Sequence, residues 1–252
     1  MTRDDGRRGD QVRAVEYSLH SLRNAEGSLI YRSGNTRVLL AASVSEKVPA
    51  WMREAKQGWV TAEYDMHPRA NPNRRARDRV RGSIDGRSQE IQRLIGRSLR
   101  AAVDLSKLGE RTLHVDCDVL DADGGTRTAA ITGAFVAVAI ALDGLRKRGL
   151  VDAGVLREPV AAVSVGWLEG RPLLDLCYEE DRDAEVDLNV VASARGGIVE
   201  VQGTAEGAPL PRSDFDALVD MALAGMKELV AGQRRALEEA EVDLDRLLPR
   251  KG

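Results

Sequence analysis

The stretch VLDADGGTRTAAITGAF, residues 119–135, places two adjacent glycines, an arginine and two threonine hydroxyls at the start of an apolar, alanine-rich segment. A helix that begins here leaves N–H groups unpaired and partly positive, and such a helix end can hold an anion. Thr126 and Arg127 would complete a phosphate site there, while Gly125 allows a tight turn and close approach to a ligand. The alternative is an ordinary strand-to-helix turn with Thr126 as its N-cap, and this stretch alone leaves both interpretations open.

Two other ligand classes do not fit this stretch. The pattern of a kinase-type phosphate loop, G-x-x-x-x-G-K-[ST], is absent, and no lysine follows the glycines. The aspartates before the glycines suggest a calcium loop, but the glutamate that would close such a loop is missing. What remains is a site for free phosphate or for a phosphodiester.

A second candidate site is the acidic stretch LLDLCYEEDRDAEVDLNVV, residues 173–191. A cluster this acidic is costly to bury unless it serves a metal ion or a proton transfer. The ordinary interpretation is a solvated turn, and we adopt it for Glu179, Asp183 and Glu185. Asp187 differs because it stands between two apolar residues in an otherwise apolar strand. If it is buried beside a phosphate site, it is a candidate general acid or metal ligand.

Arginine gathers in residues 65–87, which hold proline, asparagine and glycine without apolar periodicity and therefore predict a long basic loop. Arg87 precedes a helix that we expect to begin with Ser88 as its N-cap. Alone it reads as a surface arginine, but beside a second anion-binding turn it could form a bidentate clamp. Charge runs are more often solvated surface, yet this run lacks interleaved aromatic residues and suits contact with a polyphosphate backbone. The run consists of Arg69, Arg74, Arg75, Arg77, Arg79 and Arg81.

The composition excludes several classes of protein. The chain has 252 residues, is 43% hydrophobic and 31% charged, and carries a formal net charge of −3, which argues against a general polycation. Its N-terminus has no apolar core of the signal-peptide kind, and no uncharged apolar run is long enough to span a bilayer, so we expect no membrane partner. Cys117 and Cys177 read as buried, reduced thiols in strands, which predicts a cytoplasmic protein. Three scattered histidines make a zinc site improbable.

The apolar patterning predicts hairpins followed by a helix, twice, and hence an α+β domain of two similar halves with a seam near residue 150. A capping box of Ser213 and Asp216 is expected to open the last helix, and the tail LLPRKG is expected to be loose. The expected elements are a hairpin over 28–46 that turns at Gly34-Asn35, a helix over 88–105, a strand over 111–120, a helix from 126 to about 146, a hairpin over 159–180 that turns at Glu169-Gly170, a hairpin of 186–193 with 197–205, and a helix from Ser213.

Together these residues resemble ribonuclease PH, the phosphorolytic exoribonuclease family that includes polynucleotide phosphorylase and the exosome ring subunits. The resemblance covers nearly the whole chain in the family's order. It is carried by AEGSLIYRSGNTRVLLAASV, QGWVTAEYDMHPR, GRSQEIQRLIGRSLRAAVDL, DCDVLDADGGTRTAAITGA, LDLCYEEDRDAEVDLNVV and EVQGTAEG.

The resemblance implies a reaction in which inorganic phosphate, as co-substrate, attacks the 3′-terminal phosphodiester of RNA and releases a nucleoside diphosphate. The reverse reaction adds nucleotides, and the implied substrate is the 3′ trailer of precursor tRNA. By similarity, Arg87 and the Gly125-Thr126-Arg127 turn hold the attacking phosphate.

By the same similarity, Asp181 and Asp187 are the family's two functional aspartates. Asp187 would either protonate the leaving 3′-oxygen or, with Asp181 in support, bind a divalent ion such as Mg²⁺. The basic loop would guide the 3′ end of the RNA together with two arginines of the following helix. The implied RNA-binding residues are Arg69, Arg74, Arg75, Arg77, Arg93 and Arg97.

The family fold implies mixed sheets packed on helices, with two similar halves in one compact domain over residues 1–252. The halves would span about 10–148 and 155–242. The family also assembles as a homohexamer, a trimer of dimers that encloses a basic channel, which would make further copies of this chain its partners.

Three departures from the family pattern are His67, Asn71 and Arg182, and they affect the details of RNA contact. Two other functions compete. A non-catalytic RNA-binding ring subunit would not need the full set of arginines and aspartates. A hydrolytic nuclease would need carboxylates that bind two metal ions and would leave an arginine-lined anion site without purpose.

Overall fold

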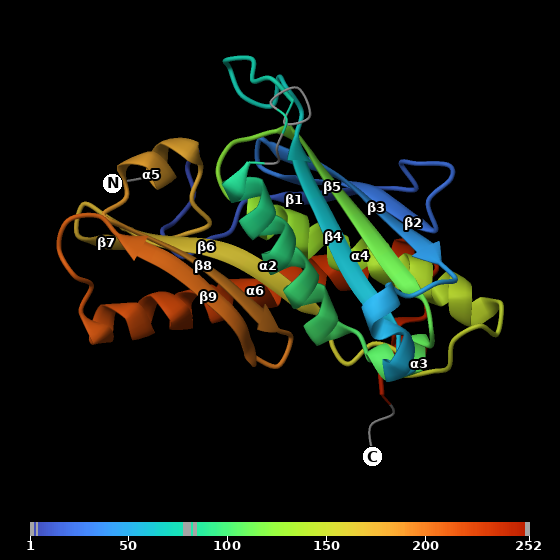
Figure 1. The fold of residues 1–252 in the computed structure, drawn as a ribbon. Coiled ribbons are helices and arrows are strands. Elements are labelled where there is room, and N and C mark those ends of the chain that lie inside the picture. The colour runs from blue at the N-terminus through green and yellow to red at the C-terminus, as the bar shows by residue number, and fades with distance from the viewer. Residues whose placement is uncertain (1–2, 4, 78–81, 83–84, 250–252) are drawn as a thin grey trace.

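Two β-sheets, one from each half of the chain, pack on helices, and the long helix α4 (Thr126–Lys147) contacts both sheets (Figure 1). The structure is a computed structural model that describes residues 3, 5–77, 82 and 85–249. The expected α+β fold of sheets packed on helices is confirmed. Arg79 and Arg81 of the expected basic loop lie outside the described residues.

The first sheet has five strands in the order β1-β2-β3-β5-β4, with β4 and β5 parallel and the other neighbours antiparallel. The expected hairpin with its turn at Gly34-Asn35 is formed by β2 and β3. Along β5, Leu113, Val115, Cys117 and Val119 are buried, as their alternation predicts. The strands are β1 (Val15–Leu19), β2 (Gly27–Ser33), β3 (Thr36–Ser45), β4 (Trp59–Met66) and β5 (Thr112–Asp121).

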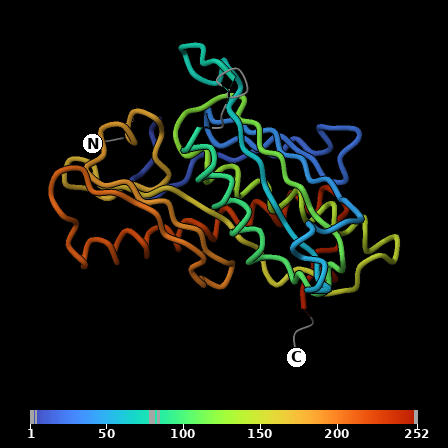
Figure 2. The backbone as a smooth tube through the Cα atoms, in the orientation of Figure 1, coloured from blue at the N-terminus to red at the C-terminus, as the bar shows by residue number. Residues whose placement is uncertain are grey.

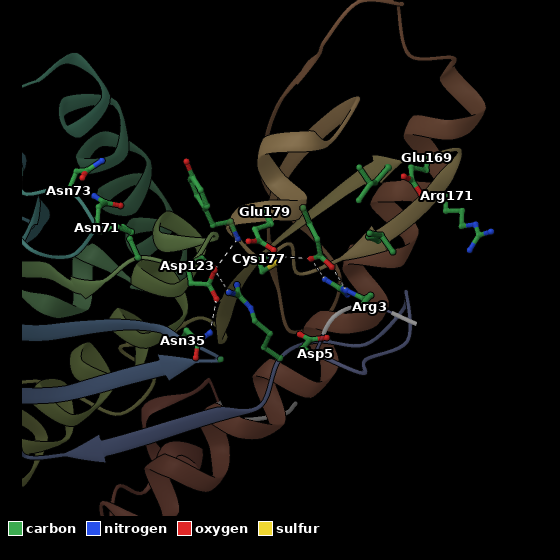
Figure 3. Close-up of a pocket in the computed structure, with 18 of the residues that line it drawn as sticks. Arg3, Asp5, Asn35, Asn71, Asn73, Asp123, Glu169, Arg171, Cys177 and Glu179 are labelled. Carbon is green, nitrogen blue, oxygen red and sulfur yellow. Dashed lines mark hydrogen bonds and ion pairs between the residues drawn. The ribbon is translucent and has the colours of Figure 1, made fainter. Parts of the chain in front are cut away.

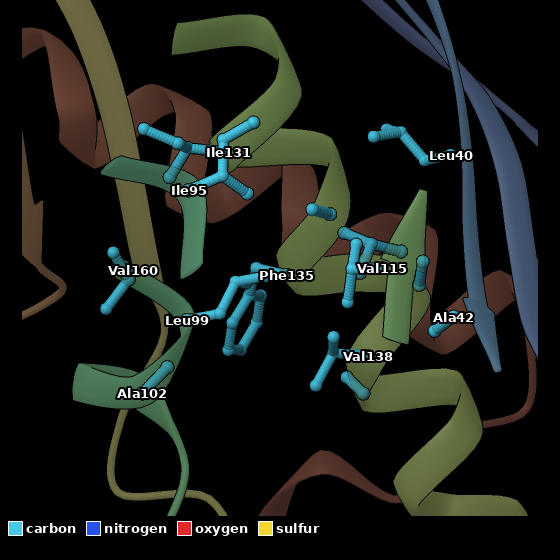
Figure 4. Close-up of a cluster of buried hydrophobic side chains, with 14 of the residues drawn as sticks. Leu40, Ala42, Ile95, Leu99, Ala102, Val115, Ile131, Phe135, Val138 and Val160 are labelled. Carbon is cyan, nitrogen blue, oxygen red and sulfur yellow. The ribbon is translucent and has the colours of Figure 1, made fainter. Parts of the chain in front are cut away.

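Helix α4 forms the centre of the hydrophobic core. It is long and apolar enough to cross a membrane, but nearly all of its apolar stretch is buried inside the molecule, as expected for a core helix. Phe135 on α4 lies between Leu99 of α2 (Gly86–Ala102) and Val115 of β5 (Figure 4). Because α2 and β5 hold this helix from two sides, the position of its N-terminus is also fixed.

The second sheet has four antiparallel strands in the order β7-β6-β8-β9, with α6 packed on it. Both expected hairpins form, but the first ends at Leu174, and the residues after it turn into a short helix, α5, instead of extending the strand to 180. The elements are β6 (Val160–Leu168), β7 (Arg171–Leu174), α5 (Tyr178–Asp183), β8 (Val186–Ser193), β9 (Ile198–Ala205) and α6 (Arg212–Glu239).

Three helix starts differ from the sequence-based expectation. Helix α2 begins at Gly86 with Asp85 as its cap, two residues before Ser88. The N-cap of α4 is Gly125, in a left-handed conformation, so Thr126 is the first helical residue. Helix α6 begins after Pro211 without a side-chain cap, so the expected capping box of Ser213 and Asp216 does not form, and Asp216 pairs with Arg212 instead.

Three short helices complete the described part of the chain, and one of them corrects the expected loose tail. Leu247, within that tail, is buried in the last of the three. The short helices are η1 (Ala50–Ala55), α3 (Leu105–Leu108) and α7 (Leu244–Leu247).

Both cysteines are free thiols. Cys117 is buried in β5, as expected, but Cys177 is only half-buried and precedes α5 instead of lying in a strand. The cytoplasmic location that the free thiols suggest stays a prediction.

Candidate active site

The turn from β5 into α4 packs directly against the segment that leads into α5. Gly124 and Gly125 both have positive φ, +69° and +60°, which explains the pair of glycines in the sequence. A Cβ atom on Gly124 would lie 2.6 Å from the backbone of Leu176 and Cys177. The glycines therefore allow close packing against the second half of the protein itself, where the sequence predicted close approach to a ligand. This packing brings the start of α4 beside the acidic stretch.

Arg127, in the first turn of α4, is mostly buried and faces groups from two other elements. Its Nη1 atom donates a 3.2 Å hydrogen bond to Gln202 on β9 and lies 3.6 Å from a carboxylate oxygen of Glu90 on α2. Arg87, in the first turn of α2, is exposed, and its charge acts together with that of Arg127 on Asp181 and Asp187. The structure therefore brings together the two arginines that the sequence singles out.

Thr126 is buried beside these arginines, and its hydroxyl is hydrogen-bonded at 2.8 Å to the hydroxyl of Tyr64 on β4. Burial raises the pKa of Tyr64, although the Thr126 bond and the charges of Arg87 and Arg127 act in the opposite direction. Tyr64 was not among the site residues expected from the sequence. The alternation of small or apolar residues with polar ones over 59–66 is the signal that could have placed it on a strand.

Asp187 lies on β8 with one carboxylate oxygen buried and unpartnered. Its Oδ1 atom has no hydrogen-bond partner among the described residues, and its Oδ2 atom accepts a 3.4 Å bond from the amide of Asn189. Burial, aided by the like charge of Asp181, raises the pKa of Asp187 to about 6. The charges of Arg87 and Arg127 and the Asn189 bond act in the opposite direction without cancelling this rise. A carboxyl that titrates near neutral pH is suited to proton transfer.

Asp181 lies on α5, partly buried, and completes the group. Burial raises its pKa, while the charges of Arg87, Arg127 and Arg13 act to lower it. The other acids assigned to a solvated turn, Glu179, Asp183 and Glu185, are exposed, which confirms that assignment. Two carboxylates and two arginines thus share one electrostatic environment at the start of α4.

The same two carboxylates are the groups that could hold a divalent ion. No cluster of three or more histidine, cysteine or acidic side chains suited to a metal occurs among the described residues. Mg²⁺ nevertheless often takes only one or two protein carboxylates and completes its shell with water and substrate phosphates. The unpartnered Oδ1 of Asp187 is the feature of this structure that fits such an ion.

The arginines assigned to RNA contact are exposed but not equivalent. Arg97 is committed to a bidentate ion pair with Glu200, and Arg75 lies 3.6 Å from Asp85. A cleft of about 1120 Å³ runs from the basic loop, at Asn71 and Arg75, to the first turn of α5. The six residues assigned to this role, Arg69, Arg74, Arg75, Arg77, Arg93 and Arg97, all reach solvent.

The position of Asp187 gives a titration that can be measured directly. In metal-free buffer, the Asp187 carboxyl should titrate near pH 6 by carbon NMR. Asp181→Asn removes the like charge, so the pKa of Asp187 should fall, and Asp183→Asn on exposed helix surface should leave it unchanged. Titration of Asp187 in the wild-type protein near the ordinary value of about 4 would contradict this description.

Comparison with known proteins places this geometry in a family. Residues 11–142 match domain 1 of the 3′ exoribonuclease family, and residues 158–225 match domain 2. Similar solved structures are rice (Oryza sativa) Rrp46, with 19% identity and a TM-score of 0.75 over 93% of this chain and 100% of that chain, and an Archaeoglobus fulgidus exosome with RNA bound to the active site, with 25% identity and a TM-score of 0.71 over 94% of this chain and 92% of that chain.

A chain of an archaeal exosome core is 24% identical, with a TM-score of 0.70 over 91% of this chain and 90% of that chain. The two less similar structures, from rice and from the archaeal core, show the shared fold. The two domain matches together cover most of the sequence, in the order that the two sheets follow along the chain. The protein therefore belongs to the 3′ exoribonuclease family typified by ribonuclease PH.

Proposed function

We propose that the protein is a phosphorolytic 3′-to-5′ exoribonuclease that trims the 3′ trailer of precursor tRNA with inorganic phosphate. The observation that carries this proposal is the grouping of Arg87, Thr126 and Arg127 at the start of α4 with the buried carboxyl of Asp187. An anion site beside a carboxyl that titrates near neutral pH supplies both requirements of the reaction, a bound nucleophile and a proton.

The attacking phosphate would bind between the two arginines, over the first turn of α4. Its approach to a phosphodiester brings several negative charges together, and guanidinium groups and helix N–H groups can offset their repulsion. Arg127 is suited to this role because Gln202 and Glu90 hold its Nη1 atom while its other donors remain available. Tyr64, through the Thr126 hydroxyl, would fix the orientation of the first helical residue.

In the reaction, an oxygen of inorganic phosphate forms a bond to the phosphorus of the terminal phosphodiester, and the bond from that phosphorus to the 3′-oxygen breaks. The 3′-oxygen receives a proton, which leaves the RNA one nucleotide shorter with a 3′-hydroxyl, and the released nucleotide is a diphosphate. Asp187, with its pKa raised to about 6, carries that proton in a minor fraction of the molecules at neutral pH and in a larger fraction as the pH falls. Reversal of the same steps would add nucleotides from nucleoside diphosphates.

A divalent ion, Mg²⁺ in our proposal, would be held by Asp187 and Asp181. When bound, it would offset negative charge on the reacting phosphates. The unpartnered Oδ1 of Asp187 supports this assignment. The proton-donor and metal-ligand roles of Asp187 are the two alternatives that the site offers.

The RNA would approach over the basic loop and the exposed face of α2. The similarity to an archaeal exosome with RNA bound to its active site supports an RNA substrate at this site. Arg69, Arg74, Arg77 and Arg93 are exposed and suited to phosphate contacts. Arg97 contributes less in this arrangement because Glu200 already occupies its guanidinium.

We further propose a homohexamer built as a trimer of dimers. Two of the similar solved structures are of archaeal exosomes, and Trp51, which is 66% exposed, is a large apolar side chain of the kind that subunit contacts bury. Light scattering of the purified protein should give six chains per particle, and a monomer at micromolar concentration would contradict the assembly.

The two competing functions have less support. A non-catalytic ring subunit would have no need for a buried carboxyl with a pKa near 6 beside two arginines. A hydrolytic nuclease with two metal ions would need more ligands than the pair Asp181 and Asp187, and no larger metal-type cluster occurs in the described part of the chain.

Incubation with a precursor tRNA that carries a short 3′ trailer tests the proposal. With Mg²⁺, nucleoside diphosphates should appear by chromatography only when inorganic phosphate is present. Monophosphates without added phosphate would mean hydrolysis and would overturn the mechanism. RNA binding without release of nucleotides in either condition would favour the non-catalytic subunit.

Variants separate the roles of the two halves of the site. Arg127→Gln should lower kcat/KM for phosphate by about 100-fold or more, because it removes a charged donor from the anion site. Asp187→Asn should lower kcat by about 100-fold or more at pH 7. Arg148→Gln, at the exposed far end of α4, and Asp183→Asn, on exposed α5 surface, are matched controls. Equal losses in a variant and its control would show that the change is not specific to the site.

A further inference from the structure

Three arginines near the N-terminus are buried although the reaction does not use them. Arg3, Arg7 and Arg13 are each less than a tenth exposed, and all three reach the segment that joins β7 to α5. Buried arginines are rare unless their charge is paired, so this arrangement needs an explanation. In Figure 2 the N-terminal segment runs beside α5 before it enters β1, and in Figure 3 Arg3 lies at the edge of the cleft that Cys177 also lines.

Arg3 holds the first turn of α5. Its Nε atom donates a 2.6 Å bond to Glu180, Nη2 donates to the second oxygen of the same carboxylate, and Nη1 donates at 2.7 Å to the carbonyl of Leu174. The Glu180 carboxylate also accepts a 2.9 Å bond from the N–H of Cys177, the cap of α5. Glu180 is therefore fixed from both sides, and Asp181 is the next residue along the chain.

Arg13 joins the same segment to the turn before α4. Its Nη2 atom and its backbone N–H donate to the two carboxylate oxygens of Asp175 at 2.6 and 2.7 Å, and its Nη1 atom donates at 2.6 Å to the carbonyl of Asp123. Burial alone would raise the pKa of Asp175, but Arg13 outweighs burial and holds that pKa below its ordinary value. Asp175 also adopts φ +54°, a conformation that is costly for a residue other than glycine.

Besides Arg3, two other residues contact the N-terminal end of α5. Asp123 accepts a 3.2 Å bond from the N–H of Tyr178, and Arg7 lies 3.9 Å from Glu180. Helix α5 has six residues, none of them buried, and a helix this short is not stable without outside contacts. Its neighbours in the site, Arg87 and Arg127, belong to the first half of the chain. The position of Asp181 therefore depends on the contacts at the ends of α5 more than on packing of α5 itself.

We propose that Arg3 and Arg13 form a clamp that positions α5, with Arg3 holding Glu180 so that Asp181 stays beside Asp187 and the anion site. Arg13 sets the distance between the same segment and the turn that precedes α4. Arg3 and Arg13 are positioning residues, because they act through Glu180 and Asp175. The inference rests on the proposed function for its kinetic consequence, but its structural consequence is independent of activity.

The test compares Arg3→Ala with Arg8→Ala, a matched control in the same segment whose side chain is 74% exposed and pairs only with Asp10 among the described residues. In Arg3→Ala, hydrogen exchange of the amides of residues 178–183 should become about tenfold faster or more, with the core of α4 unchanged. The kcat for phosphorolysis should fall about 10- to 100-fold. The KM for phosphate should stay within about twofold of the wild-type value, because the arginines of the anion site belong to the other half of the chain. Arg8→Ala should match the wild type in all three measurements.

A second variant tests the same ion pair without removing Arg3, so the test does not depend on whether Arg3→Ala folds. Glu180→Gln retains the size of the side chain and removes its charge, so it should reproduce the faster exchange in α5. The double variant should be no worse than the more impaired single variant, since both changes break one pair. Unchanged exchange in α5, or loss of kcat and phosphate binding in parallel, would overturn the clamp. Failure of the wild-type protein to release nucleoside diphosphates would overturn the proposed function. The clamp would then be tested by the hydrogen-exchange measurement alone.

Discussion

Attraction between charges from opposite halves of the chain is the interaction on which the site depends. Arg87 and Arg127 come from the first half, and Asp181 and Asp187 come from the second. The charges of both arginines act to lower the pKa of each aspartate and so favour the charged carboxylates in this partly buried setting. Burial and the like charge of Asp181 nevertheless raise the pKa of Asp187 to about 6. A bound phosphate would therefore lie beside a carboxyl that still carries a proton in a minor fraction of the molecules at neutral pH.

The fold brings the two arginines and the two aspartates together because it fixes the position of one helix end. Helix α4 is buried between the two sheets, so its N-terminus cannot shift without disturbing the core. The turn before it packs on the backbone of Leu176 and Cys177 at a distance that only glycine at position 124 allows. The second half contributes a strand for Asp187 and a short helix without buried residues for Asp181. The clamp proposed for Arg3 and Arg13 acts on this short helix.

Much of this could be predicted from the sequence because the signals are local. The glycines, Thr126 and Arg127 are adjacent in the chain. The alternation along β5 predicts the strand that ends just before them, and so it predicts where the next helix begins. The helical state of Asp181 was not predicted, because the apolar run over 173–177 resembles a strand and a six-residue helix has too few turns to show periodicity. Tyr64 was missed for another reason: its partner Thr126 lies 62 residues away, and only the parallel pairing of β4 with β5 brings them together.

The central claim is that an oxyanion binds at the start of α4 between the two arginines, and arsenate tests it most directly. Arsenate resembles phosphate in shape and charge, and its arsenic atom can be located in crystals by anomalous scattering. We expect a strong arsenic peak within hydrogen-bonding distance of Arg87, Arg127 and the first N–H groups of α4, and we expect Arg127→Gln to abolish it. Arsenate bound only along the basic loop, or a peak at α4 that persists in Arg127→Gln, would contradict it.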